Sequence, residues 1–395
     1  MVRVPKGHLT DVVEVMIKFN PVFRCLLGLG GLLVSVWAGA ESGVASKSSW
    51  PMFRGGPALT GVSPAALPDK PVLKWTFEIG DPIKSSAAIE DGVVYLGADD
   101  GSVYALDLKN GTKKWQFATD GMIESSPLVL GAKVYFGSGD GFLYALDKQN
   151  GELAWKYETE DQILGAPNWV KSPKGNSNWI VTGSYDYFLH CVDAETGQEV
   201  WKYETGNYIN GAPAVADGKT VFGGCDALLH VISLADGKKI SEVPAGAYIP
   251  GSAAMADSLV YVGHYESEFL CIDLKAKALK WTYRDRNFPY YSSPAVTDKW
   301  VIVGGRDKRL HCIDRTTGVE KWKFSTRGKV DSSPVVSGSK VVVGSTDGRL
   351  YFVSLEEGKE LWSYEIGESI IASPAVIEGW VVIGAEDGVV YAFGE

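Results

Sequence analysis

The sequence predicts an all-β fold, an eight-bladed β-propeller of four-stranded antiparallel blades. Three observations carry this prediction. One pattern of about forty residues returns eight times along the chain, and each copy holds four short apolar runs separated by turn signals. No segment shows a sustained 3.6-residue apolar period, so we expect almost no helix. The two ends of the repeat region each carry part of one copy, which indicates that they pair to close a ring.

A glycine at the end of the second predicted strand marks the period. Consecutive glycines are forty or forty-one residues apart, except for one step of forty-six that contains a polar insert at residues 172–178. An acidic residue follows three positions after each glycine, and Asp-Gly between apolar runs is a strong hairpin signal. The glycines are Gly97, Gly137, Gly183, Gly223, Gly263, Gly304, Gly344 and Gly384. The acids are Asp100, Asp140, Asp186, Asp226, Glu266, Asp307, Asp347 and Asp387.

The second unit illustrates the four strands. A small pair, Ser125-Ser126, opens the first strand, and the second runs from Val134 to Gly137. The third covers residues 142–147, and the fourth is centred on Trp155. Valine, isoleucine, tyrosine and tryptophan dominate these runs, as they do in pleated strands.

The ends of the repeat region indicate how the ring closes. The chain stops at Glu395 after the third strand of the last unit, whereas residues 73–77 form a fourth strand without a unit of its own. Pairing the two removes edges that would otherwise recruit other chains. We therefore assign residues 72–395 to one propeller domain. Residues 41–71 form a lead-in segment that we expect to pack across the outside or one face.

Residues 1–40 are typical of a secretory signal peptide. Lys18 and Arg24 precede a short apolar run that ends in small residues at Ala40, where we expect cleavage. The run is shorter than the ~20 residues of a membrane span, although an uncleaved anchor remains the alternative. Met16 competes with Met1 as the start, because residues 1–15 lie unusually far upstream. The prediction is a periplasmic or secreted protein with no transmembrane anchor in the mature chain.

Composition excludes one class of partner. The chain has 45% hydrophobic and 22% charged residues, as soluble globular proteins do. Its net charge of −10 becomes more negative without residues 1–40, which carry four basic and two acidic side chains. Such a surface repels phosphate backbones, so nucleic acid is not expected as a partner. We expect other envelope proteins instead, with this chain as a monomer within a complex.

The connection between the third and fourth strands carries a family resemblance. In the first unit it reads Ala105, Asp107, Gly111 and Trp115, and the same spacing returns in later units. This resembles the tryptophan-docking motif of the quinoprotein (pyrroloquinoline-quinone-like) repeat family, over roughly residues 72–394. The resemblance implies that each tryptophan is held between neighbouring blades. The docking tryptophans are Trp75, Trp115, Trp155, Trp201, Trp281, Trp322 and Trp362.

Two positions depart from this motif. Ser241 replaces the tryptophan of the fourth unit, and Lys277 replaces the glycine of the fifth. We expect a weaker joint at Ser241.

The resemblance leaves two function classes open. The family includes dehydrogenases, which hold pyrroloquinoline quinone and calcium over the central axis. It also includes non-catalytic propellers similar to the lipoprotein subunit of the outer-membrane β-barrel assembly machinery. The chain lacks the adjacent cysteine pair and the long inserted loops of the dehydrogenases, so it resembles the non-catalytic class more. We expect no cofactor, no metal and no catalytic residue, with quinone and calcium as the alternative.

One residue precedes the small pair in every unit, and we expect these eight residues near the mouth of the central channel. Their polar and aromatic members are the candidate cofactor-binding residues: Lys84, Glu124, Asn210, Tyr291 and Asp331. Glu124, Asn210 and Asp331 carry oxygen donors of the kind that calcium takes. The others are apolar: Leu164, Pro250 and Ile371.

Aromatic and arginine residues concentrate in the loops of units four to six, as interface anchors do. The candidate partner-binding face comprises Tyr185, Tyr208, Tyr248, Tyr265, Arg284, Arg286, Phe288, Tyr290, Arg306 and Arg327. These residues could instead line a solvated channel mouth. Two further alternatives stay open, a partner strand docked on a blade edge and a sensor of small molecules or polysaccharide.

Histidines and cysteines indicate packing rather than chemistry. His190, His230 and His311 share one repeat position where other units have tyrosine. Three cysteines likewise share one strand position in different units: Cys191, Cys271 and Cys312. Equivalent sites in different blades lie too far apart for a disulfide, whose Cα atoms stay within ~7 Å. With Cys225 in a turn, we expect four unpaired thiols.

Overall fold

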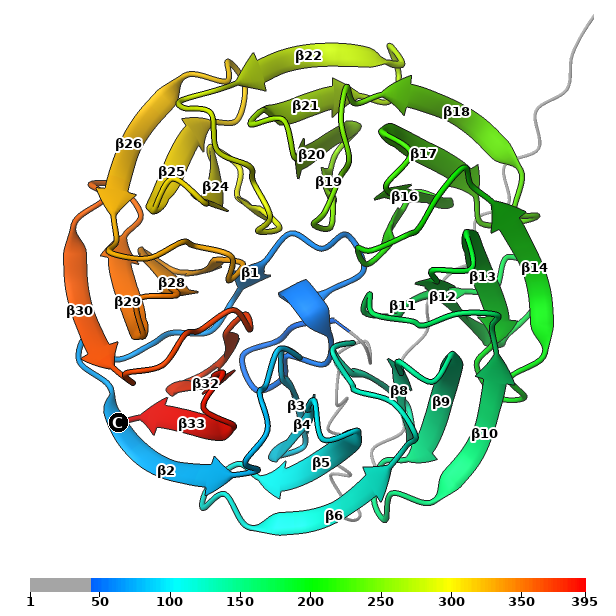
Figure 1. The fold of residues 1–395 in the computed structure, drawn as a ribbon, viewed down its shortest axis with the longest axis horizontal. Coiled ribbons are helices and arrows are strands. Elements are labelled where there is room, and N and C mark those ends of the chain that lie inside the picture. The colour runs from blue at the N-terminus through cyan, green and yellow to red at the C-terminus, as the bar shows by residue number, and fades with distance from the viewer. Residues whose placement is uncertain (1–43) are drawn as a thin grey trace, which may run out of the picture. The chain divides into compact units, whose positions relative to one another are not determined.

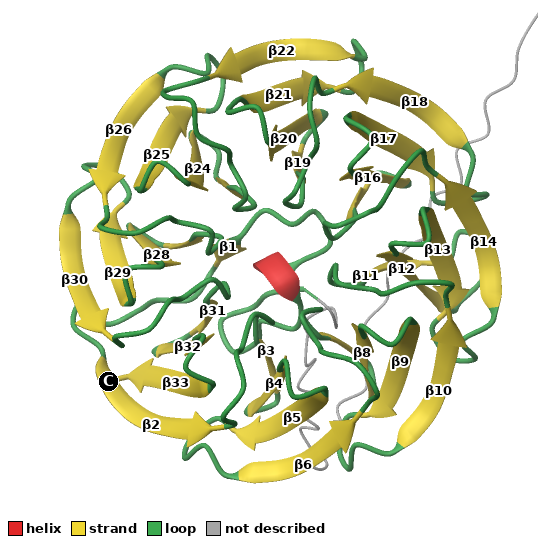
Figure 2. Cartoon of the chain, viewed as in Figure 1, coloured by secondary structure: helices red, strands yellow, loops and turns green. Residues whose placement is uncertain are grey.

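Eight antiparallel sheets stand radially around a central axis, and the chain visits them one after another (Figure 1). The computed structural model describes residues 44–395; the predicted signal peptide, its cleavage at Ala40 and the choice between Met1 and Met16 lie outside them. In seven blades, four consecutive strands follow one another from the axis outward. The eight-bladed all-β fold is confirmed. A three-residue 3-10 helix, η1 (Phe53–Gly55), is the one helical element within residues 44–395 (Figure 2).

Blades one to four share the same order of strands from the axis outward. Their strands are β3 (Ala88–Glu90), β4 (Val93–Gly97), β5 (Ser102–Asp107) and β6 (Lys113–Ala118); β7 (Leu128–Leu130), β8 (Lys133–Gly137), β9 (Phe142–Asp147) and β10 (Leu153–Glu158); β11 (Asn168–Lys171), β12 (Asn178–Gly183), β13 (Phe188–Asp193) and β14 (Glu199–Glu204); and β15 (Ala214–Ala216), β16 (Lys219–Gly223), β17 (Leu228–Ser233) and β18 (Lys239–Pro244).

Blades five to seven repeat this order. Their strands are β19 (Ala254–Ala256), β20 (Leu259–Gly263), β21 (Phe269–Asp273) and β22 (Ala278–Tyr283); β23 (Ala295–Val296), β24 (Trp300–Gly305), β25 (Arg309–Asp314) and β26 (Glu320–Ser325); and β27 (Val335–Ser337), β28 (Lys340–Gly344), β29 (Arg349–Ser354) and β30 (Glu360–Glu365).

Blade eight combines both ends of the repeat region. It contains β31 (Ala375–Ile377), β32 (Trp380–Gly384) and β33 (Val389–Gly394), and its outer strand is the N-terminal β2 (Val72–Glu78). β2 pairs antiparallel with β33 along its length, as Figure 1 shows near the C-terminus. The predicted closure of the ring is therefore confirmed.

The glycine that sets the repeat period is required by the packing of neighbouring blades. A Cβ atom on Gly97 would lie 2.8 Å from the Cβ of Ile123 in blade two, closer than real side chains approach. The same conflict arises at Gly137 against Ile163 of blade three. The second strands thus end in glycine because the next blade places a side chain, such as Ile123 or Ile163, directly against the backbone.

The tryptophan joint implied by the family resemblance is present. Trp115 is buried, and its Nε1 donates a hydrogen bond of 3.0 Å to the carbonyl of Lys148 in the next blade. Gly151, in the turn that follows β9, has a φ of +74°, and a Cβ atom there would lie 2.7 Å from the indole. Five further tryptophans, Trp75, Trp155, Trp201, Trp281 and Trp322, meet a glycine of the following blade in the same way, whereas Trp362 packs against Phe393.

The two exceptions to the motif meet at one joint. Ser241 replaces the tryptophan of blade four, and Lys277 occupies the turn of blade five that this tryptophan would meet. Lys277 keeps the positive φ, at 53°. Because no indole covers this turn, a Cβ atom there meets no ring, and the glycine is not required. The absence of the tryptophan at Ser241 therefore explains why Lys277 can replace the glycine.

The lead-in segment lies on the axis and not along the outside of the ring (Figure 1). Its backbone carbonyls accept hydrogen bonds from the innermost strands of several blades: Ile89 and Val129 donate to Trp50 and Pro51, and Val336 donates to Gly61. Between them, Val215, Met255 and Val296 donate to Pro57, Ala58 and Thr60. The segment then forms β1 (Val62–Ser63), which pairs in parallel with β27. Sequence pattern could not place it, because its partners are backbone groups.

The turn acids anchor the third strands. Asp140 accepts hydrogen bonds from the backbone N–H of Phe142, at 3.1 Å, and from the hydroxyl of Tyr144, at 2.7 Å. In blade three His190 replaces the tyrosine, and its Nε2 lies 3.0 Å from Asp186. The other ring nitrogen of His190 lies 3.1 Å from the hydroxyl of Tyr157 in blade two. These histidines therefore hold neighbouring blades together.

Candidate functional site

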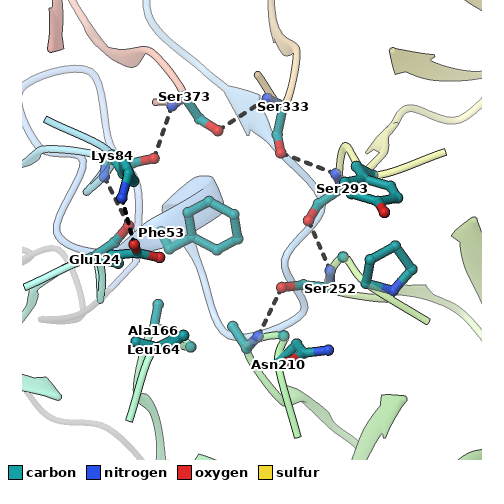
Figure 3. A pocket seen from close by; sticks show the side chains of 18 of the residues that line it. Phe53, Lys84, Glu124, Leu164, Ala166, Asn210, Ser252, Ser293, Ser333 and Ser373 are labelled. Carbon is teal, nitrogen blue, oxygen red and sulfur yellow. Dashed lines mark hydrogen bonds and ion pairs between the residues drawn. The ribbon is translucent and has the colours of Figure 1, made fainter. Parts of the chain in front are cut away.

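A pocket of about 180 Å³ opens on the axis, on the side of the ring where the first strands begin (Figure 3). All eight residues predicted at the channel mouth line it: Lys84, Glu124, Leu164, Asn210, Pro250, Tyr291, Asp331 and Ile371. Phe53 of η1 lies at the centre of the ring, where the lead-in crosses the axis, and forms the floor. The repeat position thus predicted which residues meet on the axis, whereas the floor was not foreseen.

A belt of serines that sequence reasoning did not single out as a site surrounds this pocket. Each is the second residue of the small pair, and its hydroxyl accepts the backbone N–H of the preceding blade (Figure 3). The six serines are Ser86, Ser126, Ser252, Ser293, Ser333 and Ser373. Blades three and four have Ala166 and Ala212 there. The small pair was the available signal, but its hydrogen bonds join different blades.

The charged groups at the mouth are paired. The ammonium of Lys84 lies 2.8 Å from Asp99 and 2.7 Å from Glu124. Burial lowers the pKa of Lys84, but the two carboxylates outweigh it and leave that pKa raised. Across the pocket the guanidinium of Arg306 donates two hydrogen bonds, of 3.0 and 2.9 Å, to the carboxylate of Asp331. The same guanidinium stacks 3.5 Å above the ring of Tyr291. Arg306 therefore neutralises Asp331, whereas the single positive charge of Lys84 is shared between Asp99 and Glu124.

The oxygen donors do not fit a calcium ion. Glu124, Asn210 and Asp331 come from blades two, four and seven, and the two carboxylates are bound by cations. Asn210 donates to Cys225 Sγ at 3.0 Å, which leaves one buried amide oxygen without a partner among the described residues. Calcium takes six to eight oxygens at ~2.3–2.6 Å. The arrangement supplies too few free oxygen donors to hold a calcium ion.

A cluster of two carboxylates and one imidazole near blade six resembles a metal site in its ligand types. Asp285, Asp307 and His311 of blade six bring their ligand atoms within 4.8 Å of one another. However, Asp285 already pairs with Arg309 at 2.9 Å and with Lys323 at 3.0 Å. These two cations supply the positive charge that a metal would bring.

The predicted partner-binding face is largely exposed. Tyr248 and Tyr265 are 55% and 52% exposed, and Tyr208 and Phe288 are exposed as well. Tyr185 stacks on Tyr208 with ring centroids 4.7 Å apart. The arginines Arg284, Arg286 and Arg327 are also exposed.

Sequence reasoning missed one member of this face. The exposed Tyr187 has its ring centroid 5.2 Å from that of Tyr208. It lies in a turn with a φ of 75°, and its place next to Tyr185 was the only signal.

Tyr290 is a correction. The sequence placed it on the exposed face, but only 3% of it is exposed. It occupies the repeat position of Ile123 and Ile163, and its side chain packs against the backbone of Gly263 in blade five. The two neighbouring tyrosines point in different directions: Tyr291 lines the pocket, whereas Tyr290 packs into the interface between blades five and six.

The four predicted free thiols are confirmed. Cys191, Cys271 and Cys312 are buried, Cys225 is partly exposed, and none of the four forms a disulfide. Burial raises the pKa of the Cys271 thiol to about 11. Within residues 44–395, no helix has the length and apolar character needed to cross a bilayer.

Comparison with solved structures places the fold among propellers of several functions. BamB from Moraxella catarrhalis matches with 20% identity over 82% of this chain and 98% of its own, with a TM-score of 0.66. A quinohemoprotein alcohol dehydrogenase from Comamonas testosteroni matches with 15% identity over 89% and 81%, with a TM-score of 0.76. A computationally designed protein, Ika8, matches with 18% identity over 84% and 100%, with a TM-score of 0.72. At these identities the likeness shows the fold alone.

A comparison with curated proteins finds no match. In contrast, the model of one protein family matches residues 72–174, 167–240, 237–324 and 306–394, which together span the propeller. That family is described as outer membrane protein assembly factor BamB, and its repeat is pyrroloquinoline-quinone-like. The chain therefore belongs to the family of outer membrane protein assembly factor BamB, within the pyrroloquinoline-quinone-like propellers.

Proposed function

We propose that this chain is a non-catalytic binding propeller that holds a partner protein in the cell envelope, outside the cytoplasm. The observation that carries the proposal is the cluster of exposed tyrosines on blades three to five. Tyrosine supplies a large contact area and a hydrogen bond at little conformational cost, which is why it is enriched at interface centres.

The surface around Tyr265 favours a protein partner. Two hollows flank this side chain, one of about 360 Å³ bordered by Arg284 and Pro289 and one of about 300 Å³ bordered by Tyr248 and Ala247. An exposed aromatic ridge between two hollows suits a surface that interlocks with side chains of a partner. Arg284 at its edge adds hydrogen-bond donors that interfaces favour.

The state of the mouth carboxylates argues against the dehydrogenase alternative. A calcium-dependent site would need Glu124 and Asp331 to release Lys84 and Arg306. Breaking such partly buried pairs is unfavourable unless the ion replaces every contact. The family membership and the predicted signal peptide support an envelope location, including a role in outer-membrane protein assembly.

A photo-crosslinking experiment tests the proposal. A benzophenone amino acid is placed at Tyr265 or Tyr248, and in a control at Val319, which is 64% exposed in the turn after β25. We expect the two rim positions to form defined adducts with one envelope protein, and the control to form none. Equal labelling at all three positions would contradict a specific face.

A second measurement addresses the alternative function. The mature protein is titrated with pyrroloquinoline quinone, with and without calcium, while tryptophan fluorescence is followed. We expect no saturable quenching. Calcium-dependent saturation at micromolar quinone would refute the non-catalytic assignment and direct mutation to Glu124, Asn210 and Asp331.

A further inference from the structure

Basic side chains concentrate in one sector of the face on which the axial pocket opens. The segments that form this sector, in or next to blades six and seven, are residues 284–289, 305–309, 326–331 and 346–348. They hold seven basic and four acidic side chains, in a chain whose net charge is −10. We call this surface the basic sector. Its positive charge runs against the composition of the whole chain, so composition does not explain it.

The four acidic side chains of the basic sector are partly buried and have partners inside the protein. Asp285 pairs with Arg309 at 2.9 Å and with Lys323 at 3.0 Å. The other three are Asp331 with Arg306, Asp307 with His311, and Asp347 with the hydroxyl of Tyr351. The fully exposed charge of the sector is therefore positive.

Four exposed cations of the sector have no partner. Among the described residues, none of their side chains forms an ion pair or a hydrogen bond. They are Arg286, Lys308, Arg327 and Lys329. Backbone bonds hold their loops side by side, because the N–H of Thr326 donates to the carbonyl of Lys308 at 3.0 Å and that of Thr346 to Lys329 at 2.9 Å. Neighbouring cations without counter-charges create a positive potential that attracts an anionic partner.

The opposite side of the same face is acidic. Blades two and three lie across the axis from blades six and seven (Figure 1). The loops that lead into them carry Asp120, Glu160 and Asp161, which are exposed and form no ion pair among the described residues. The nearby cation, Lys84, is already paired with two carboxylates. The face therefore has a positive and a negative side, with the pocket between them.

This division favours a protein segment over a membrane as the anionic partner. A flat anionic bilayer on this face would also press its phosphates against Asp120, Glu160 and Asp161, and like charges repel. A single extended segment is narrow enough to lie on the basic sector alone. Phe288, which is 46% exposed within the sector, adds an apolar contact that a lipid phosphate cannot use but a side chain can.

We propose that the basic sector binds an acidic segment of the partner protein, in which Asp and Glu residues flank an apolar side chain. The carboxylates pair with the four free cations, and the apolar side chain packs on Phe288. The acidic side of the face repels the same segment, which fixes its position on the ring. The inference rests on the proposed function, because the segment belongs to the protein that the exposed tyrosines hold.

Fluorescence anisotropy with a labelled peptide tests the proposal. The probe is a peptide of alternating Asp and Glu residues around one central Phe, and the same peptide with Asn and Gln is the neutral control of equal size. We expect the mature protein to bind the acidic peptide saturably, and roughly tenfold or more tighter than the neutral one. This preference should disappear in about 1 M NaCl, where charges are screened within ~3 Å.

Two double variants locate the site. Lys308→Glu with Arg327→Glu reverses two adjacent charges of the sector and should weaken binding of the acidic peptide roughly tenfold or more. The matched control is Lys275→Glu with Lys299→Glu. These lysines are exposed in turns at the opposite ends of β22 and β24, so the control changes the net charge equally on the other face. It should change the affinity by less than about twofold, because charges beyond a Debye length are screened.

Four results would overturn the assignment. Equal binding of the acidic and the neutral peptide would exclude charge recognition, and equal weakening by the two double variants would reduce the effect to net charge. Binding to phosphatidylglycerol vesicles without binding to the peptide would assign the sector to a membrane. A salt-sensitive dimer in sedimentation velocity, lost in the Lys308→Glu and Arg327→Glu variant, would assign it to the acidic side of a second copy.

Two checks keep these outcomes distinct from other failures. Circular dichroism of each variant establishes that the fold is retained. Peptide binding without specific crosslinking at Tyr265 would refute the tyrosine face alone, whereas specific crosslinking without peptide binding would refute only the acidic segment.

Discussion

The tryptophan joint allows a sharp prediction about stability. Gly151→Ala adds a methyl group 2.7 Å from the Cδ2 and 2.8 Å from the Cε3 of Trp115, in a turn residue with a φ of +74°. The left-handed conformation costs a non-glycine residue about 1–2 kcal/mol, and overpacking a buried contact costs about 1–3 kcal/mol. We therefore expect the free energy of unfolding to fall by about 2–5 kcal/mol.

The matched control is Lys277→Ala, at the same turn position in the blade whose neighbour has Ser241 in place of tryptophan. It keeps a Cβ atom in the left-handed conformation and meets no indole, so we expect a change within about 0.5 kcal/mol. Urea unfolding, followed by tryptophan fluorescence and by circular dichroism, measures both variants. If the two substitutions have equal effects, the indole contact is not the reason for the glycine.

Three further outcomes are expected. Burial raises the pKa of Asp186, but the hydrogen bond from His190 outweighs this effect and leaves the pKa lowered. The stability that this pair contributes is present above the unfolded-state pKa of ~3.9. It is lost as the pH falls through the lower folded-state pKa. The urea midpoint of His190→Phe should thus depend less on pH below about 4 than that of the native chain. Deleting residues 44–67 should lower the melting temperature yet keep the strand content, because β2 still closes blade eight; a random-coil spectrum would contradict this. Iodoacetamide should label only Cys225 in the folded mature protein, and mass spectrometry that finds rapid labelling of Cys271 would show that the blade packing is wrong.

The sequence by itself determined the repeat, the number of blades and the way the ring closes. These features are covalent regularities: the glycines that end the second strands, the docking tryptophans and the strand at residues 73–77 recur at fixed spacing whatever their surroundings. The same period also predicted that Lys84, Glu124, Asn210 and Asp331 meet on the axis, because equivalent positions of a ring share one radius.

Tertiary structure alone decided what those residues do once they meet. Lys84 forms an ion pair with Glu124 of the next blade, and Arg306 forms one with Asp331, although the partners are 40 and 25 residues apart in sequence. The repeat pattern likewise could not predict which side chains are exposed. Tyr290 and Tyr291 are neighbours of the same type, but Tyr290 fills a blade interface and Tyr291 faces the pocket. The lead-in contributes the floor, Phe53, and the buried Arg54 through hydrogen bonds of its backbone, which leave no periodic signature in side chains. Sequence therefore encodes the radial scaffold, whereas pairing across blades and closure of the axis arise only when the ring brings distant segments together.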